Sequence, residues 1–142
     1  MNKYKELKDK QQKEIDAFPF GVCFSEKQYE EMMTKWNLSV DDTDKICAVG
    51  GGCYIRKTDK DAFLNMLKRF EEEKQAAINE DSTGNGFIYD MFLYELGNHE
   101  YCITYDLTET FDALNVTQET IDKDKRFARG LKKAVKDYLK NF

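Results

Sequence analysis

The segment Phe87–Leu96, with the sequence FIYDMFLYEL, constrains the fold more than any other part of the chain. A helix built from this segment is apolar on nearly every face, which is typical of a helix buried at the centre of a domain. Gly97-Asn98 follows directly, and a glycine at this position commonly ends a helix. The sequence therefore predicts a central buried helix over residues 87–96.

Four further helices are predicted from apolar residues at helical spacing, and two of them also from capping patterns that begin at Ser25 and Thr58. They cover residues 2–16, 25–37, 58–79 and a C-terminal amphipathic stretch that begins at Thr117 or Asp122. A short helix is also expected from Asp106 through Leu114, because Asp106 and Thr108 provide a start signal for it.

The strand signals are short. Residues 22–24, 46–49, 53–56 and 101–105 are rich in β-branched, aromatic or cysteine side chains. Gly50-Gly51-Gly52 lies between the second and third of these segments, where it is a natural hairpin turn. We therefore predict an α+β fold that is mostly helical, with about five helices and a small antiparallel sheet or hairpin. The chain has 142 residues and only one Pro, which favours a single domain over residues 1–142 without a long flexible linker.

The cellular location and the redox state of the cysteines are predicted from sequence signals that the chain does not contain. No apolar run reaches the roughly 18 residues of a membrane span, and Met1–Asp16 is charged throughout, unlike a signal peptide. These features predict a cytoplasmic protein without membrane contact. The four cysteines (Cys23, Cys47, Cys53 and Cys102) do not follow a zinc-binding spacing, and His99 is the one histidine. We expect reduced, partly buried thiols, with no metal and no cofactor; a zinc site made of three cysteines and His99 is the weaker alternative.

The charges are distributed unevenly along the chain. Residues 75–122 contain no Lys or Arg and ten acids, namely Glu80, Asp81, Asp90, Glu95, Glu100, Asp106, Glu109, Asp112, Glu119 and Asp122. Residues 123–142 reverse the balance, with eight basic residues and two acids. One interpretation is internal complementarity, in which the basic C-terminal helix covers the acidic stretch. The other is an exposed acidic face that attracts a basic groove on a partner. Direct nucleic-acid binding is not expected, because the chain is acidic and its basic helix lacks interleaved aromatic residues.

Two polar constellations were considered as sites. Glu95 and His99 are four residues apart and would share one helix face, where a carboxylate can orient a histidine. Asp90 and Glu100 complete this candidate catalytic cluster, but no nucleophile motif accompanies it, and a structural network is the simpler interpretation. Gly50, Gly51 and Gly52 with Arg56 form a candidate anion-binding loop, although no phosphate-loop motif is present. No residue is predicted to be catalytic.

Two blocks of the sequence carry a resemblance. They run from Thr43 to Asp59, through the glycine triplet, and from Gly86 to Asp106. They resemble a family of small uncharacterised proteins encoded by phages and integrated elements of Firmicutes, and the resemblance extends over most of the chain. It supplies no catalytic residue. It implies a role among small acidic inhibitors of host defence, including anti-CRISPR proteins, an association that comes from genome context.

The functional expectation is a non-enzymatic binding protein that inhibits a host defence nuclease. Its binding residues are predicted to be the acids Glu100, Asp106, Glu109 and Asp112, next to a dense set of aromatic residues. The expected partner is a host protein with a basic, nucleic-acid-binding groove. The alternative is a small enzyme or a nucleotide-signal-binding protein that uses Asp90, Glu95, His99 and Glu100.

Overall fold

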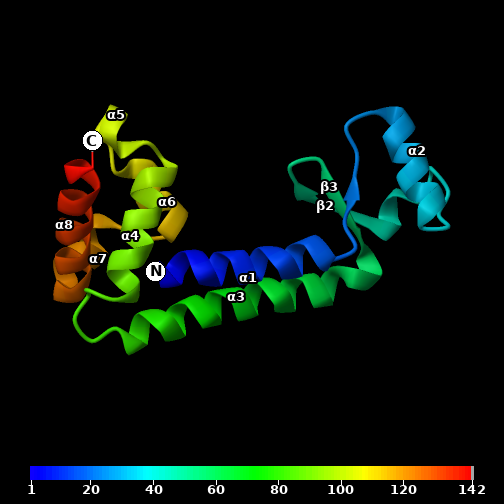
Figure 1. Ribbon diagram of the computed structural model, residues 1–142. Helices are drawn as coiled ribbons and strands as arrows, with labels where there is room; N and C mark the ends of the chain where they lie inside the picture. Colours follow the sequence, from blue (N-terminus) through cyan, green and yellow to red (C-terminus); the bar gives the residue numbers. More distant parts are fainter. Residues whose placement is uncertain (142) are drawn as a thin grey trace. The chain divides into compact units, whose positions relative to one another are not determined.

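The computed structural model describes residues 1–141, which form eight α-helices and one three-stranded antiparallel sheet (Figure 1). The helices are α1 (Lys3–Ala17), α2 (Glu26–Lys35), α3 (Lys60–Glu80), α4 (Phe87–Asn98), α5 (Tyr101–Thr104), α6 (Thr108–Leu114), α7 (Gln118–Lys123) and α8 (Lys125–Lys140). The strands are β1 (Gly21–Val22), β2 (Ile46–Gly50) and β3 (Cys53–Arg56).

The chain divides into two compact units. The helical unit comprises Met1–Lys13 and Glu72–Phe142, and the sheet unit comprises Glu14–Glu71. Both boundaries fall inside helices, one in α1 and one in α3, so each of these helices contributes residues to both units. The single domain predicted over residues 1–142 stays a prediction.

In the helical unit, α4 is the central element, as the sequence predicted. Phe87, Ile88, Met91, Phe92 and Leu96 of this helix are all buried. The longest neighbour that packs along α4 is α8, whose Phe127, Ala134 and Tyr138 belong to the same core. The apolar residues of α8 repeat at helical spacing, so one side of this helix enters the core and the other side is left to charged residues.

In the sheet unit, the strand order is β1-β3-β2, with antiparallel pairing throughout. The predicted hairpin is confirmed: β2 and β3 pair with Cys47 opposite Ile55, and the glycine triplet turns between them. Gly50, Gly51 and Gly52 all have positive φ, which explains why glycine occupies the whole turn. Ile55 and Met33 of α2 are fully buried and form part of the core of this unit.

The prediction of about five helices was wrong, because the described chain contains eight. Residues 101–105 were expected as a strand, but residues 101–104 form α5 and Tyr105 follows it; they have no partner strand, and β-forming side chains alone do not make a sheet. The single C-terminal helix is in fact two. Asp124 adopts an extended conformation between α7 and α8, and its carboxylate accepts a hydrogen bond from the backbone N–H of Arg126, which starts a new helix.

None of the helices in the described range combines the length and the apolar character that crossing a membrane requires.

Candidate functional site

The four predicted binding acids lie within residues 100–112 of the helical unit. Glu100 directly precedes α5, and Asp106 lies two residues before the start of α6. Glu109 and Asp112 stand on α6 at a spacing of three. All four are exposed. His99 Nδ1 lies 3.3 Å from Glu109 Oε2, and this contact closes the chain between them into a compact loop. We call Glu100, Asp106, Glu109 and Asp112 the acidic face.

Two large apolar side chains are exposed within this loop. Ile103 is 71% exposed and Tyr105 is 66% exposed, so both side chains are available to a partner. The ring of Tyr105 packs edge-on against Tyr101, with ring centroids 5.7 Å apart, and Tyr101 in turn contacts the buried Tyr138. The exposed ring is therefore held by the core of the unit.

The backbone around α5 is strained. Glu100 and Tyr105, the residues that flank this helical turn, both have a φ of 52°, in the left-handed region that non-glycine residues rarely adopt. Such conformations persist where the surrounding structure enforces them, and they concentrate at functional sites. The strain thus falls on the segment that carries the exposed apolar residues and the acids.

The basic helix α8 does not neutralise these acids. In the part of the chain that the structure describes, no Lys or Arg lies within ion-pair distance of Glu100, Asp106, Glu109 or Asp112. Arg126 pairs with Asp124 at 2.8 Å, which keeps this ion pair local to the start of α8. Ion pairing between α8 and the acidic face, as internal complementarity would require, is therefore not observed among residues 1–141.

The alternative polar cluster is brought together in part. Glu95 is 1% exposed, and its carboxylate accepts a hydrogen bond from the Tyr4 hydroxyl at 2.9 Å and lies 3.1 Å from His99 Nε2. Lys8 Nζ approaches the same carboxylate at 3.7 Å. Burial and the negative charge of Glu95 raise the pKa of Tyr4 well above its usual value, so the hydroxyl stays protonated and donates.

His99 has both ring nitrogens against carboxylates, Nε2 against Glu95 and Nδ1 against Glu109. A histidine that acts as a general base needs one nitrogen free to reach the substrate. This arrangement instead joins α4 to the first turn of α6 and supplies a partner to a buried carboxylate, as a structural network does.

Asp90 does not belong to this cluster. Its carboxylate accepts a hydrogen bond from the backbone N–H of Lys3 at 3.0 Å, and its carbonyl accepts one from the Asn2 side chain at 2.8 Å. Asp90 therefore satisfies the N-terminal end of α1, where helices leave backbone N–H groups unpaired.

The candidate anion-binding residues are also separated. The glycine triplet stands at one end of the β2–β3 hairpin, whereas Arg56 is paired with Ile46 at the other end. The Arg56 Nε donates to Asp59 at 2.9 Å, and its guanidinium lies 6.0 Å from the centre of the Trp36 ring. Arg56 thus serves the start of α3 and does not point into the turn.

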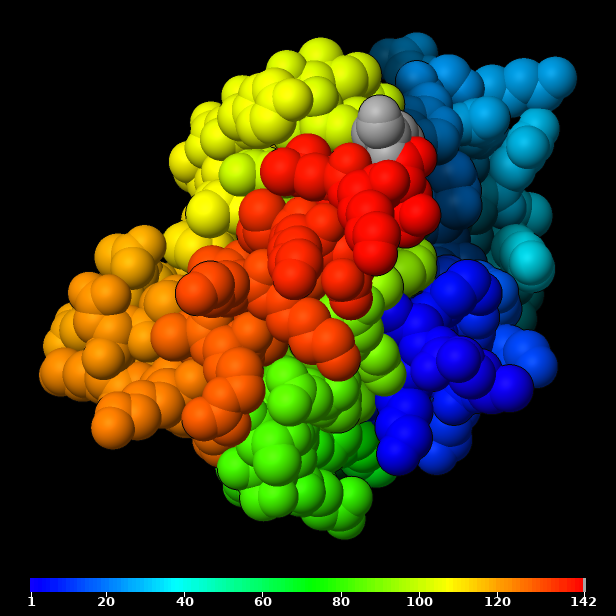
Figure 2. Space-filling model, turned by 60° about the vertical axis from the view of Figure 1, so that its left-hand side comes forward, coloured from blue at the N-terminus to red at the C-terminus, as the bar shows by residue number. Residues whose placement is uncertain are grey.

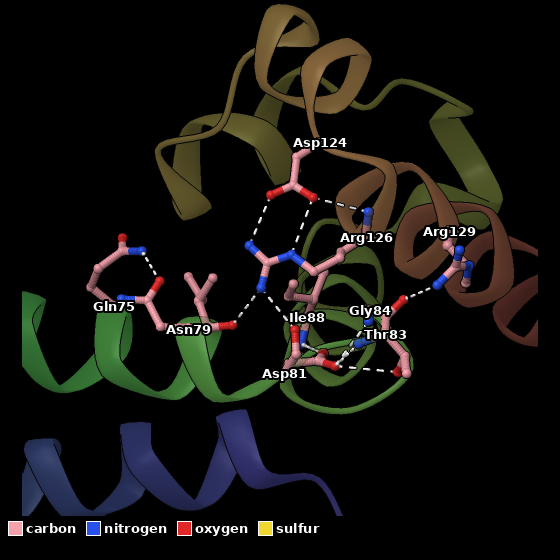
Figure 3. A network of polar contacts seen from close by, with 10 residues as sticks. Gln75, Asn79, Asp81, Thr83, Gly84, Ile88, Asp124, Arg126 and Arg129 are labelled. Carbon is pink, nitrogen blue, oxygen red and sulfur yellow. Dashed lines mark hydrogen bonds and ion pairs between the residues drawn. The ribbon is translucent and has the colours of Figure 1, made fainter.

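Asp81, at the end of α3, organises the loop that leads into α4 (Figure 3). Its carboxylate accepts hydrogen bonds from the backbone N–H groups of Thr83, Gly84, Gly86 and Ile88, at 2.8–3.2 Å. Burial alone raises the pKa of Asp81, but these four donors outweigh it and hold the pKa below its usual value. The anion at the N-terminus of α4 is therefore a side chain of the protein itself.

A groove of about 710 Å³ runs along α1, the end of α3 and this loop. Leu7, Ala77 and Phe87 form its apolar floor, and side chains of both charges, including Lys3 and Glu80, line its rim. Sequence patterns did not reveal this groove.

The cysteines are distributed over both units. Cys23, Cys47 and Cys53 belong to the sheet unit and Cys102 to the helical unit; all four are free thiols and half-buried. Within residues 1–141, no group of three or more His, Cys, Asp or Glu side chains is placed to hold a metal ion.

Several residues of the site went unnoticed in the sequence. Tyr4 and Lys8 had no local signal, because their partner Glu95 is about ninety positions away. The sequence predicts Ile103 and Tyr105 within a strand, and their exposure follows only from the helical turn at residues 101–104.

Comparison with known proteins finds a match to one family model. No curated protein and no solved structure matches the chain. The model of a family of unknown function, DUF7659, matches residues 3–137, which is nearly the whole chain. The protein therefore belongs to the DUF7659 family.

Proposed function

We propose that this protein is a non-enzymatic binding protein that uses the acidic face, with Ile103 and Tyr105, to occupy a basic groove on another protein. The finer part of the proposal is that the partner is a host defence nuclease and that occupation inhibits it, in the manner of an anti-CRISPR protein. The family match does not bear on either part.

The observation that carries the proposal is the exposed pair Ile103 and Tyr105 inside a set of carboxylates without Lys or Arg partners in the described chain. Aromatic anchors with a charged surround are typical of protein-binding surfaces. Tyr105 is held by Tyr101, so little side-chain entropy is lost when a partner covers it. The carboxylates provide the negative potential that speeds encounter with a basic groove.

The site chemistry supports binding more than catalysis. The carboxylate of Glu95 is buried and accepts from Tyr4, both nitrogens of His99 face carboxylates, and Asp90 supports α1. A small enzyme or nucleotide-signal-binding protein built on these residues would have to break this network before it could use them.

The expected mode of inhibition is steric and electrostatic. A groove that binds nucleic acid is lined by Lys and Arg for phosphates. Four exposed carboxylates on one short stretch of chain offer such a groove an alternative set of anions, and Ile103 and Tyr105 add apolar contacts that a phosphate backbone lacks. Nucleic acid and this protein would then compete for one surface.

An amide variant tests the acidic face without removing its hydrogen-bond acceptors: Glu100→Gln, Asp106→Asn, Glu109→Gln and Asp112→Asn. The partner is first isolated from host lysate with the parent protein, and association is then measured by surface plasmon resonance against salt. We expect the amide variant to associate about ten-fold more slowly at low salt, with a flatter salt dependence. Nucleic acid should compete with the parent protein for the partner.

A matched control removes the same number of charges elsewhere, through Glu30→Gln, Glu31→Gln, Asp41→Asn and Asp44→Asn in the sheet unit. This control should associate like the parent. Parent-like binding and inhibition by the amide variant at low salt would refute the acidic-face proposal. If the isolated partner does not bind nucleic acid, the proposal that this protein occupies a nucleic-acid-binding groove is wrong.

A further inference from the structure

The solvent side of α8 carries a row of cations. Successive residues of an α-helix are rotated by about 100°. On this geometry, Lys125, Arg129, Lys132, Lys133, Lys136 and Lys140 fall within an arc of about 100°. All six are exposed, and α8, drawn in orange to red, runs across the face of the molecule shown in Figure 2. We call these six residues the basic row; it extends over about 22 Å of helix.

The basic row is not neutralised by carboxylates. No ion pair joins any of its six residues to an acid within residues 1–141. Arg129 donates to the backbone carbonyl of Thr83, and the Lys133 ammonium lies 4.6 Å from the centre of the Tyr89 ring. Asp137, the acid on α8 beside the row, instead accepts a hydrogen bond from the Tyr89 hydroxyl at 2.7 Å. The positive charge of the row therefore faces solvent.

The apolar and aromatic residues of α8 indicate which type of partner the basic row can bind. The aromatic residues of α8, Phe127 and Tyr138, are buried against α4, and Ala128 is the exposed apolar residue of this helix. Binding in a membrane interface requires an exposed apolar face of large side chains. A protein partner would need an aromatic or aliphatic anchor. Lys and Arg side chains, by contrast, bind the phosphates of nucleic acids without an apolar anchor, and this binding does not depend on the base sequence.

We propose that the basic row binds the phosphate backbone of a nucleic-acid duplex. A duplex is favoured over a single strand because single-strand binding relies on aromatic rings on which bases stack, and the solvent side of α8 presents none. The row is straight and about 22 Å long, which lets it follow the phosphates at the edge of a groove. This binding is independent of the acidic face and goes beyond the function proposed above.

The acidic net charge of the chain does not oppose this contact. The net charge of −5 sums over all residues, whereas a phosphate experiences the charges within a Debye length of about 8–10 Å. The expectation that the protein does not bind nucleic acid directly was based on the negative net charge and on the lack of interleaved aromatic residues in the basic helix. The structure groups six cations on one helix face, and backbone contacts do not need the aromatic residues.

The test is fluorescence anisotropy with the full chain and a labelled DNA duplex of about 20 base pairs, from about 50 to 200 mM salt. With about five phosphate contacts, the slope of log K against log salt should be near −4 to −5. The variant Lys132→Gln, Lys136→Gln, Lys140→Gln should bind at least about ten-fold more weakly at low salt and reduce the slope by about 2–3. Circular dichroism shows whether each variant is folded.

The matched control is Lys27→Gln, Lys35→Gln, Lys57→Gln, three exposed lysines of the sheet unit, and it should keep the parental slope. The amide variant of the acidic face should bind the duplex at least as well as the parent, which separates this site from the proposed one. The inference is overturned if the parent shows no salt-dependent binding, if both lysine triples weaken it equally, or if a single strand or anionic vesicles bind more tightly than the duplex.

Discussion

At the scale of single residues, the buried carboxylate of Asp81 takes the acceptor role that backbone carbonyls have in a helix. Asp81 collects four backbone N–H groups from the loop and from the first turn of α4. Arg126 fixes the same corner from the other side, since its Nη1 donates to the carbonyls of Ile78 and Asp81. The conformation of the loop between α3 and α4 thus depends on the carboxylate of Asp81 and the guanidinium of Arg126.

We expect Asp81→Asn to lower the free energy of unfolding at pH 7 by about 2–3 kcal/mol, because the amide keeps one acceptor and turns a donor toward N–H groups that need an acceptor. The pKa of Asp81 is lower in the folded state, so its contribution is present above the usual value of 3.8 and is lost as the pH falls through the folded value. The difference between parent and variant should therefore narrow below pH 3.8. Urea unfolding at several pH values measures it.

The exposed acid Asp44 provides the comparison for this measurement. Asp44→Asn changes the same functional group on the surface of the sheet unit and should leave the unfolding free energy unchanged. A difference between parent and Asp81→Asn that persists in full at low pH would contradict the assignment to the ionised carboxylate.

At the scale of elements, the helical unit depends on the close approach of α8 to α4. A Cβ atom on Gly130 of α8 would lie 2.6 Å from the Gly84 carbonyl oxygen and 2.8 Å from Ile88 Cγ2. Gly97 of α4 differs, because its nearest neighbour would be the Tyr138 ring at 3.8 Å, an ordinary contact. The same substitution in two helices therefore meets opposite surroundings.

We expect Gly130→Ala to destabilise the protein by about 1–3 kcal/mol, because a backbone oxygen must move to admit the new methyl group. Gly97→Ala should stabilise it by about 0.5–1 kcal/mol through the higher helix propensity of alanine. Chemical denaturation of the two variants gives both signs. Equal effects in the same direction would show that α8 is not packed on α4 as described.

At the scale of the whole molecule, α1 and α3 each supply residues to both compact units. Because unfolding of either unit removes the support of part of each helix, we expect the two units to unfold together. Differential scanning calorimetry should give one transition, with equal calorimetric and van't Hoff enthalpies. Two resolved transitions would instead show that the units are independent domains.

Elements with local signals could be predicted from the amino-acid sequence. The all-round apolar segment 87–96 predicted the buried α4, the capping pattern from Ser25 predicted α2, and the glycine triplet predicted the β2–β3 turn. The sequence also located the acidic face, since Glu100, Asp106, Glu109 and Asp112 fall within a short stretch without Lys or Arg. Hydrophobic periodicity, helix caps and turn residues are signals that extend over only a few residues, so they can be recognised in a sequence.

Which side chains contact one another and which remain exposed depends on the packing of distant segments. Residues 101–105 have strand-forming side chains but no partner strand; residues 101–104 form α5, and Ile103 and Tyr105 are exposed. Tyr4 donates to Glu95 across a separation that no local pattern spans, and Arg56 turns to Asp59 and away from the glycine turn. The basic residues of α8 were visible in the sequence, but whether acids covered them depended on packing. Contacts between distant segments are set by the shape of the core, which is a property of all the elements together.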